Sequence, residues 1–286
     1  MESLLQQVRS CIQVRGWSPL TEEAYLRHVR KFSEHFGRCP SELGAEHAER
    51  YLLHLAQARK LSSSTRNQCA AALRFLYTVV LRRPEQAAWI PNTKSKKRLG
   101  AVLSGTEVVK VLRSLSNRRH RTLALLCYGA GLRVREACRL QIDDIDTRRS
   151  VLLIRDAKGQ KDRQVTLSPR LLKALRAYYK QYRPAGPYLF EGRGSGRPLS
   201  AAAFQIALRK AAQRAGIPKR VTPHVLRHSY ATHMVEAGAD LRSVQLLLGH
   251  NSLRSTVRYV HLSHARQKAL PSPLDMLGTE PGAALG

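Results

Sequence analysis

A helix start is encoded in residues 221–228, which read Val-Thr-Pro-His-Val-Leu-Arg-His. Thr222 is a suitable N-cap, and Pro223 suits the first helical position because an N–H there would have no partner within the helix. His224 then falls in the first turn, and Arg227 lies three residues further along the same side. A helix N-terminus attracts anions through its free N–H groups. The pattern therefore predicts either a phosphate-handling pair or a helix that contacts DNA without chemistry.

Two further segments place a reactive side chain beside a turn or a helix end. Residues 129–137, Gly-Ala-Gly-Leu-Arg-Val-Arg-Glu-Ala, predict a glycine turn that opens a helix at Arg133. A helix-turn-helix that only binds DNA fits this segment as well, and Glu136 would then be an ordinary arginine partner. Later, an apolar helix ends in Leu-Gly just before His250, and Tyr259 follows nine residues further on. Taken alone, such a tyrosine is typical of core packing.

A β-hairpin is predicted in the second half of the chain. Residues 150–156 and 163–167 are rich in β-branched and apolar residues and are bounded by turn residues, which favours two short strands. Residues 157–162, Ala-Lys-Gly-Gln-Lys-Asp, form the predicted tip. The tip carries Lys158 and Lys161.

Helical periodicity runs through the first 90 residues, with helices expected over residues 2–14, from residue 21, over 45–59 and after the serines at 62–64. Residues 91–100 lack apolar periodicity and carry four basic residues, as expected of a solvated loop or of a strap along a phosphate backbone. The fold class is therefore mainly α with a small β-sheet (α+β). We expect four parts, a helical domain at 1–90, a basic linker at 91–100, a mixed domain at 101–270 and a tail at 271–286.

The charge of the chain points to a polyanionic partner. The 286 residues include 49 lysines and arginines against 20 acidic residues, a formal net charge of +29. Residues 101–270 alone hold 32 basic and 10 acidic residues. A surplus of this size attracts nucleic acid first of all. No run approaches the about 18 apolar residues of a membrane span, and the N-terminus lacks a signal-peptide core, so we expect neither membrane insertion nor secretion.

Other kinds of site fit the sequence poorly. Residues 100–106 have the spacing of a phosphate-binding P-loop but lack its lysine. His224, His228 and His250 could bind zinc, although Arg227 would place a fixed positive charge beside the metal. The five cysteines are scattered without a CxxC pair, which favours small buried residues in a reducing cytoplasm. We therefore expect no metal, no cofactor and a cytoplasmic location.

Taken together, the motifs resemble a known family. The sequence is similar to the tyrosine recombinases, also called phage integrases, in separated motifs that follow the family's order, namely Gly-Leu-Arg133, Lys158 on a hairpin tip, His224-x-x-Arg227, Leu-Gly-His250 and Tyr259. The stretch from Thr222 to His261 looks especially close to the Xer-like branch. The resemblance covers roughly residues 2–265. It implies a SAM-like helical core-binding domain followed by a tyrosine-recombinase catalytic domain.

The resemblance implies a catalytic set that neutralises a DNA phosphate. Arg133 and Arg227 match the arginines that hold the non-bridging oxygens, a task suited to planar guanidinium forks. His250 would add a further donor. His228 and Glu136 are interpreted as supporting residues.

The remaining matched residues would make and break bonds. Tyr259 matches the nucleophile that forms a 3′-phosphotyrosyl bond, and His224 matches the acid–base position beside it. Lys158 matches the general acid for the leaving 5′-oxygen, with Lys161 as a nearby competitor. The bond to the tyrosine stores the energy of the broken phosphodiester, so neither metal nor ATP is required.

The implied partners are double-stranded DNA with specific recombination sites and further copies of the chain, arranged as a homotetramer that exchanges strands through a Holliday junction. No membrane partner is expected, and accessory recombination proteins remain open. Candidate DNA contacts outside the catalytic set are Arg66, Lys94, Lys96, Lys97 and Arg242. Arg254 and Arg258, close to Tyr259, favour a mobile-element enzyme. The alternatives are a type IB topoisomerase that relaxes supercoils and a DNA-binding protein without activity.

Overall fold

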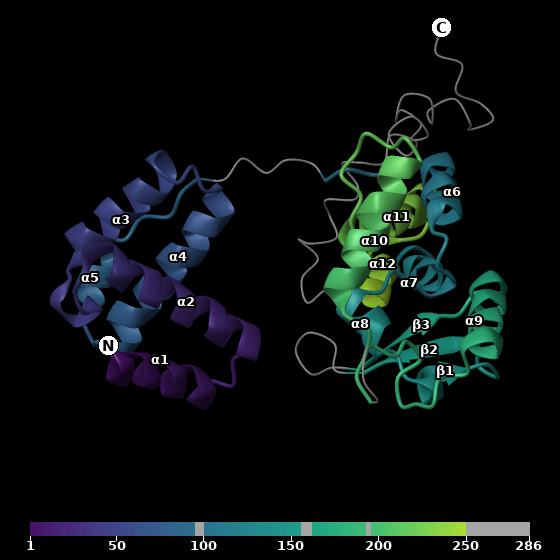
Figure 1. Ribbon diagram of the computed structural model, residues 1–286, viewed down its shortest axis with the longest axis horizontal. Helices are drawn as coiled ribbons and strands as arrows, with labels where there is room; N and C mark the ends of the chain where they lie inside the picture. The colour runs from purple at the N-terminus through teal and green to yellow at the C-terminus, as the bar shows by residue number, and fades with distance from the viewer. Residues whose placement is uncertain (95–99, 156–161, 193–195, 250–286) are drawn as a thin grey trace, which may run out of the picture. The chain divides into compact units, whose positions relative to one another are not determined.

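The computed structural model describes residues 1–94, 100–155, 162–192 and 196–249. The chain folds into two compact units, Met1–Arg98 and Leu99–Gly286 (Figure 1). None of the helices in the described ranges combines the length and the apolar character needed to cross a membrane.

All regular elements among the described residues of the first unit are helices or helical turns. Its elements are α1 (Glu2–Val14), α2 (Pro19–Phe36), a 3₁₀ turn (Pro40–Glu42), α3 (Ala45–Gln57), α4 (Ser63–Phe75), a π-helical turn (Leu76–Val80) and α5 (Pro84–Ala88). Side-chain caps start two of them, since Ser18 accepts from the Thr21 amide and Ser62 from the Thr65 amide. The helices expected at 2–14, 45–59 and after the serines are present, the second ending two residues early.

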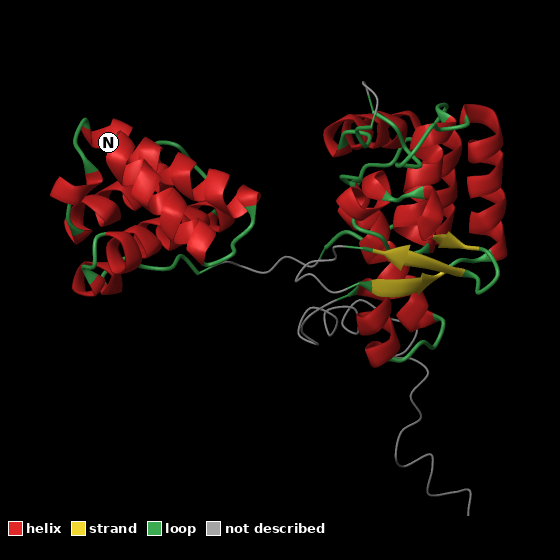
Figure 2. Ribbon diagram, turned by 90° about the horizontal axis from the view of Figure 1, so that it is seen from below, coloured by secondary structure: helices red, strands yellow, loops and turns green. Residues whose placement is uncertain are grey.

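The second unit holds the remaining elements, in which the helices predominate (Figure 2). In chain order they are α6 (Gly105–Ser114), α7 (Arg118–Gly129), α8 (Val134–Arg139), a 3₁₀ turn (Ile142–Asp144), β1 (Ile145–Asp146), β2 (Val151–Ile154), β3 (Arg163–Thr166), α9 (Pro169–Tyr182), α10 (Ala201–Arg214), α11 (Pro223–Glu236) and α12 (Leu241–Leu248). A mainly helical chain with one small sheet is the predicted fold class, and it is confirmed.

The sheet has three antiparallel strands in the order β1-β2-β3. Within the β2–β3 pair, Ile154 lies opposite Arg163 beside the hairpin tip, and Val151 lies opposite Thr166 at the far end. Both strands are shorter than the ranges predicted for them, and β1 was not predicted. Residues 157–161 of the predicted tip and the predicted tail at 271–286 lie outside the described residues.

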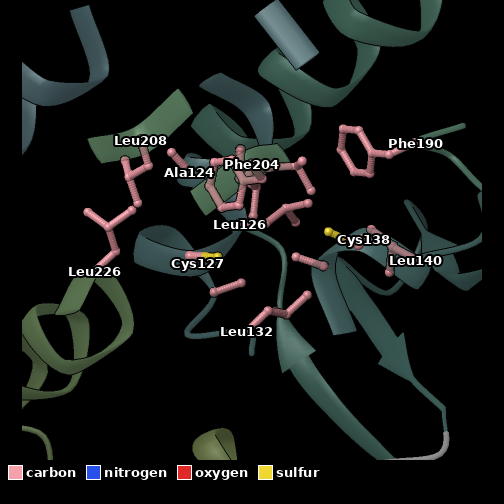
Figure 3. Packing of buried hydrophobic residues seen from close by; sticks show 14 of the residues in the cluster. Ala124, Leu126, Cys127, Leu132, Cys138, Leu140, Phe190, Phe204, Leu208 and Leu226 are labelled. Atoms are coloured by element: carbon pink, nitrogen blue, oxygen red, sulfur yellow. The ribbon is translucent and has the colours of Figure 1, made fainter. Parts of the chain in front are cut away.

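The core of the second unit packs the central helix α7 against its neighbours. Ala124 and Leu126 of α7 are fully buried, together with Phe204 of α10 and Leu226 of α11 (Figure 3). Because Leu226 is packed in this core, the rotation of α11 about its axis is fixed. The packing thereby also fixes the direction of Arg227, the next residue of the helix.

The cysteines are only partly as predicted. Cys69, Cys127 and Cys138 are buried and free. Cys11 and Cys39 are half-buried, which corrects the expectation that all five are core residues, because each lies at the edge of the first unit's core.

Candidate active site

The N-terminus of α11 is built as its sequence predicts. The hydroxyl of Thr222 accepts a hydrogen bond from the Val225 amide at 3.2 Å, and Pro223 is the first helical residue. His224 is exposed in the first turn, whereas the side chain of Arg227 is only 4% exposed. The helix therefore presents one histidine to solvent and holds one arginine inside the protein.

His228, the next residue of α11, is buried beside the start of this unit. A Cβ atom on Gly100 would lie 2.8 Å from its Nε2 atom, so the chain passes close to the imidazole ring. The amide of Leu103 then donates to the hydroxyl of Ser229 at 2.9 Å. The first residues of the second unit therefore pack against this part of α11, and the supporting role of His228 stays a prediction.

The glycine turn before α8 brings Arg133 to the carboxylate of Glu136, which Arg227 also approaches. Gly131 has a φ of +64°, and a Cβ there would lie 2.7 Å from the ring of Tyr230, so this position requires glycine. Arg133 is the N-cap of α8, and Glu136 reaches back to accept from its backbone amide at 2.7 Å. The guanidinium of Arg133 donates to the same carboxylate at 2.7 Å.

Three arginines surround the carboxylate of Glu136, whose side chain is 8% exposed. Arg163, at the start of β3, donates to its two oxygens at 2.9 and 2.7 Å. Arg133 is the second, and Arg227 lies 3.9 Å from the nearer oxygen. Three positive groups thus face one negative group, and the cluster keeps an excess of positive charge.

The same arginines bind the C-terminal end of α12. Arg163 donates to the carbonyl of Leu247 at 3.1 Å, Arg227 to that of Leu248 at 2.7 Å, and Arg133 to that of Gly249 at 3.0 Å. Arg227 also donates to the Gly131 carbonyl, which ties α11 to the glycine turn. Terminal helix carbonyls have no partner within the helix and carry partial negative charge, so cations suit this position.

The surroundings set the charge of Glu136. Burial alone would raise the pKa of this carboxyl. The hydrogen bonds and charge of Arg163, and then the amide and guanidinium of Arg133, outweigh burial and lower the pKa to about 2. Glu136 is therefore ionised at neutral pH and holds the arginines in place, while the partly exposed guanidinium of Arg133 (30%) can still meet an anion from solvent.

The predicted catalytic residues fall into two groups. Arg133 and Arg227 meet at Glu136 and at the end of α12, and His224 lies at the start of the helix that carries Arg227. Lys158, its competitor Lys161, His250 and Tyr259 lie outside the described residues. Within the described ranges, no three histidine, cysteine or acidic side chains gather into a metal site.

The candidate DNA contacts are scattered over both units. Arg66 is half-buried in α4, Lys94 is exposed at the end of the first described range, and Arg242 is exposed on α12, where it donates to Gln245 at 3.0 Å. Lys96 and Lys97 lie outside the described residues.

Arg163 is the member of the cluster that the sequence motifs do not predict. The sequence pattern predicts Arg163 only as the first residue of a strand. The alternation of strands does hold a signal, since Arg163 shares the face of buried Val165 on β3. A charged side chain on a core-facing strand position requires a partner inside the protein.

Comparison with known proteins places this geometry in a family. The sequence model of the phage integrase family matches residues 101–266. The model of the phage integrase N-terminal SAM-like domain matches residues 4–87. The chain belongs to the phage integrase family. Recombinases with the name XerA are similar to it as well, and the chain is a tyrosine recombinase of the Xer-like branch.

The relatives of this integrase-family chain match it over nearly its whole length. A Sinorhizobium fredii protein described as an integrase/recombinase, y4qK, is 41% identical over 278 residues, covering 97% of this chain and 90% of the relative. The tyrosine recombinase XerA of Thermococcus onnurineus is 36% identical over 278 residues, covering 94% and 96%. The chain is accordingly an enzyme, a site-specific DNA recombinase.

A solved structure shares the integrase fold. The XerH site-specific recombinase, bound to a palindromic difH substrate in a post-cleavage complex, has a TM-score of 0.70 and 24% identity, covering 90% of this chain and 81% of that one. At this identity the likeness is one of fold.

Proposed function

We propose that this recombinase cuts one DNA strand with Tyr259 and later rejoins it, passing through a 3′-phosphotyrosyl intermediate. The observation that carries the proposal is the meeting of Arg133 and Arg227 around Glu136, although the two arginines are far apart in the sequence. Two guanidiniums at one point supply the forked donors that a phosphodiester needs while it gains charge.

Each matched residue has one task in the proposed reaction. Arg133 and Arg227 bind the non-bridging oxygens of the scissile phosphate, and His250 adds a donor. Tyr259 attacks phosphorus while His224 assists the transfer of its proton. Lys158 protonates the 5′-oxygen that leaves.

The energy of the broken bond is kept in the phosphotyrosyl ester. A 5′-hydroxyl from another strand can therefore attack the ester and release the tyrosine, without ATP. Since guanidiniums neutralise the phosphate, the proposed reaction also needs no metal ion or cofactor.

The proposed partners follow from the chemistry of strand exchange. The substrate is double-stranded DNA with specific recombination sites, as the XerH structure contains its difH substrate. Two sites cut in turn, one strand at a time, require four active sites, so we propose a homotetramer that works through a Holliday junction. Accessory recombination proteins are compatible with this scheme, and the enzyme acts where the DNA is, in the cytoplasm.

The parts of the chain divide this work. We assign core-site DNA binding to the helical domain at 1–90, with Arg66 as a contact, and phosphate contacts to the linker at 91–100, through Lys94, Lys96 and Lys97. Residues 101–270 carry the catalytic set, and Arg242 of α12 is a further DNA contact. The tail at 271–286 is assigned no role in cleavage.

Covalent trapping tests this proposal. Nicked suicide duplexes, tiled across the DNA that flanks the gene, are incubated in EDTA with the wild type and with Tyr259→Phe. The expected result is an SDS-resistant adduct on one duplex with the wild type alone. An adduct that survives in Tyr259→Phe, or one that EDTA abolishes, contradicts the mechanism. Relaxation of supercoiled DNA that lacks the site would instead indicate a topoisomerase.

A further inference from the structure

The side chain of Arg163 has contacts on two sides of the arginine cluster. It is 9% exposed and donates to both oxygens of Glu136 and, through Nε, to the carbonyl of Leu247. All three contacts come from one planar guanidinium, which fixes their relative directions. Arg163 is therefore a bridge between the start of α8 and the end of α12.

Both ends of this bridge lead to a phosphate-binding arginine. Glu136, held by Arg163, holds Arg133 through its amide and its guanidinium. The residues after Leu247 on α12 supply the carbonyls that receive Arg227 and Arg133. A shift of Arg163 would therefore move the partners of both arginines at once.

The end of α12 is shaped to let Arg163 pass. Gly249 closes the helix with a φ of +59°, and a Cβ at this position would lie 2.8 Å from the Cδ atom of Arg163 and 3.1 Å from its Nε. The glycine thus meets two needs, a left-handed helix end and room for the arginine.

We propose that Arg163 is a positioning residue of the recombinase, which sets where Arg133 and Arg227 lie and where α12 ends, and does not itself contact DNA. The inference rests on the proposed function for its catalytic consequence. Its structural part, the fixing of the α12 end, holds independently of any DNA substrate. The two parts are tested by separate measurements on the full-length protein.

The first measurement needs no DNA. Hydrogen exchange of the peptide that covers α12 is compared between the wild type and Arg163→Gln. Arg155→Gln is the matched control, because Arg155 also pairs with a buried carboxylate of this unit, that of Asp144 at 2.6 Å rather than that of Glu136. We expect exchange at the end of α12 to become about tenfold faster in Arg163→Gln and to stay unchanged in Arg155→Gln. Unchanged exchange in Arg163→Gln overturns the proposal.

The second measurement is single-turnover cleavage of the duplex identified by trapping. We expect Arg163→Gln to bind DNA within a few-fold of the wild type and to cleave about 10- to 100-fold more slowly, the range typical when a residue that orients a functional group is lost. Arg163→Lys keeps the charge but not the fork, and we expect it to restore part of the rate. It also replaces Arg163→Gln if that variant does not fold.

A modified substrate separates positioning from general damage. In a scissile methylphosphonate one charged oxygen is replaced by methyl, so less charge depends on the arginines. We expect the loss of rate in Arg163→Gln to be smaller on this substrate than on the phosphodiester. An equal loss on both substrates, or a wild-type rate on the phosphodiester, overturns the proposal. A wild type that forms no adduct on any duplex contradicts the proposed function, and hydrogen exchange then decides the role of Arg163.

Discussion

The carboxylate of Glu136 accepts hydrogen bonds from two arginine side chains and one backbone amide. Such a group stabilises the folded protein as long as it is ionised. Because its pKa in the folded protein is about 2, against a usual value of 4.5, the unfolded chain binds the proton more readily. The contribution of Glu136 is thus fully present above the usual value and is lost as the pH falls towards about 2.

Glu136→Gln tests this residue directly. At neutral pH we expect the free energy of unfolding to fall by about 3 kcal/mol, because the substitution leaves buried guanidiniums short of their counter-ion. We also expect the stability of the variant to depend less on pH between about 5 and 2 than that of the wild type. Urea unfolding at a series of pH values measures both. An identical acid dependence of wild type and variant would show that Glu136 is not held ionised by the cluster.

Residues that act through local chemistry were predictable from the sequence. Thr222 and Pro223 specify the start of α11 by themselves, and the structure has that start where it was predicted. For Arg163 the local indication is only its place on the face of buried Val165, which names no partner. Its importance depends on Glu136 and Leu247, which neighbour it only in the folded protein.

At the scale of elements, the end of α12 combines a left-handed backbone conformation at Gly249 with the carbonyls that bind the three arginines. Gly249→Ala would place a methyl group against the side chain of Arg163. It would also put an alanine where the backbone has the left-handed conformation. Gly216→Ala is a matched control, since Gly216 has a φ of +66° and no atom within 4 Å of the added carbon.

We expect both glycine variants to lose about 1 kcal/mol of stability from the left-handed backbone alone. Only Gly249→Ala should in addition slow DNA cleavage, because it displaces Arg163. Thermal unfolding and single-turnover cleavage measure the two effects. Equal cleavage rates in the two variants would mean that the end of α12 does not control the site.

The sheet shows which elements sequence patterns can and cannot predict. The hairpin strands β2 and β3 contain β-branched side chains and are bounded by turn residues, so their own sequence predicts them. The two residues of β1, Ile145 and Asp146, are too few to show an alternation, and they become a strand only by pairing with Leu152 and Val151. Non-local pairing of this kind leaves no mark in a short window of sequence.

At the scale of the whole molecule, the charge of +29 predicts how DNA binding responds to salt. Each contact between a basic residue and a phosphate releases counter-ions from the DNA. The logarithm of the binding constant therefore falls linearly with the logarithm of the salt concentration, and the slope reflects the number of phosphate contacts. If the linker lies along the backbone, replacing Lys94, Lys96 and Lys97 by alanine should reduce this slope by about 2 to 3.

Fluorescence anisotropy on a short duplex of arbitrary sequence, over a series of salt concentrations, measures the slope. The matched control replaces three exposed basic residues of α9, Lys173, Arg176 and Lys180, by alanine. This helix follows β3 at the end of the sheet that is remote from the hairpin tip. We expect this control to change the slope much less. The linker is not a phosphate contact if the two triple variants respond alike.

The meeting of Arg133 and Arg227 was predictable only through the order of the motifs. Arg133 and Arg227 lie on different helices, and no local pattern joins them. The family resemblance supplied the link, and the structure brings the two guanidiniums to one carboxylate. What the order of motifs could not supply is the set of carbonyls at the end of α12 that holds them, because backbone groups are the same in every sequence.

The claim that Arg133 and Arg227 act together on one phosphate is tested most directly by single-turnover cleavage with Arg133→Lys, Arg227→Lys and the double variant. Lysine keeps the charge but loses the fork. We predict that each single variant binds DNA normally and cleaves about 10²- to 10³-fold more slowly. The double variant should be much less impaired than the product of the two losses, because both arginines serve one transition state. Wild-type cleavage by either single variant, or strictly multiplicative losses in the double variant, would contradict the account.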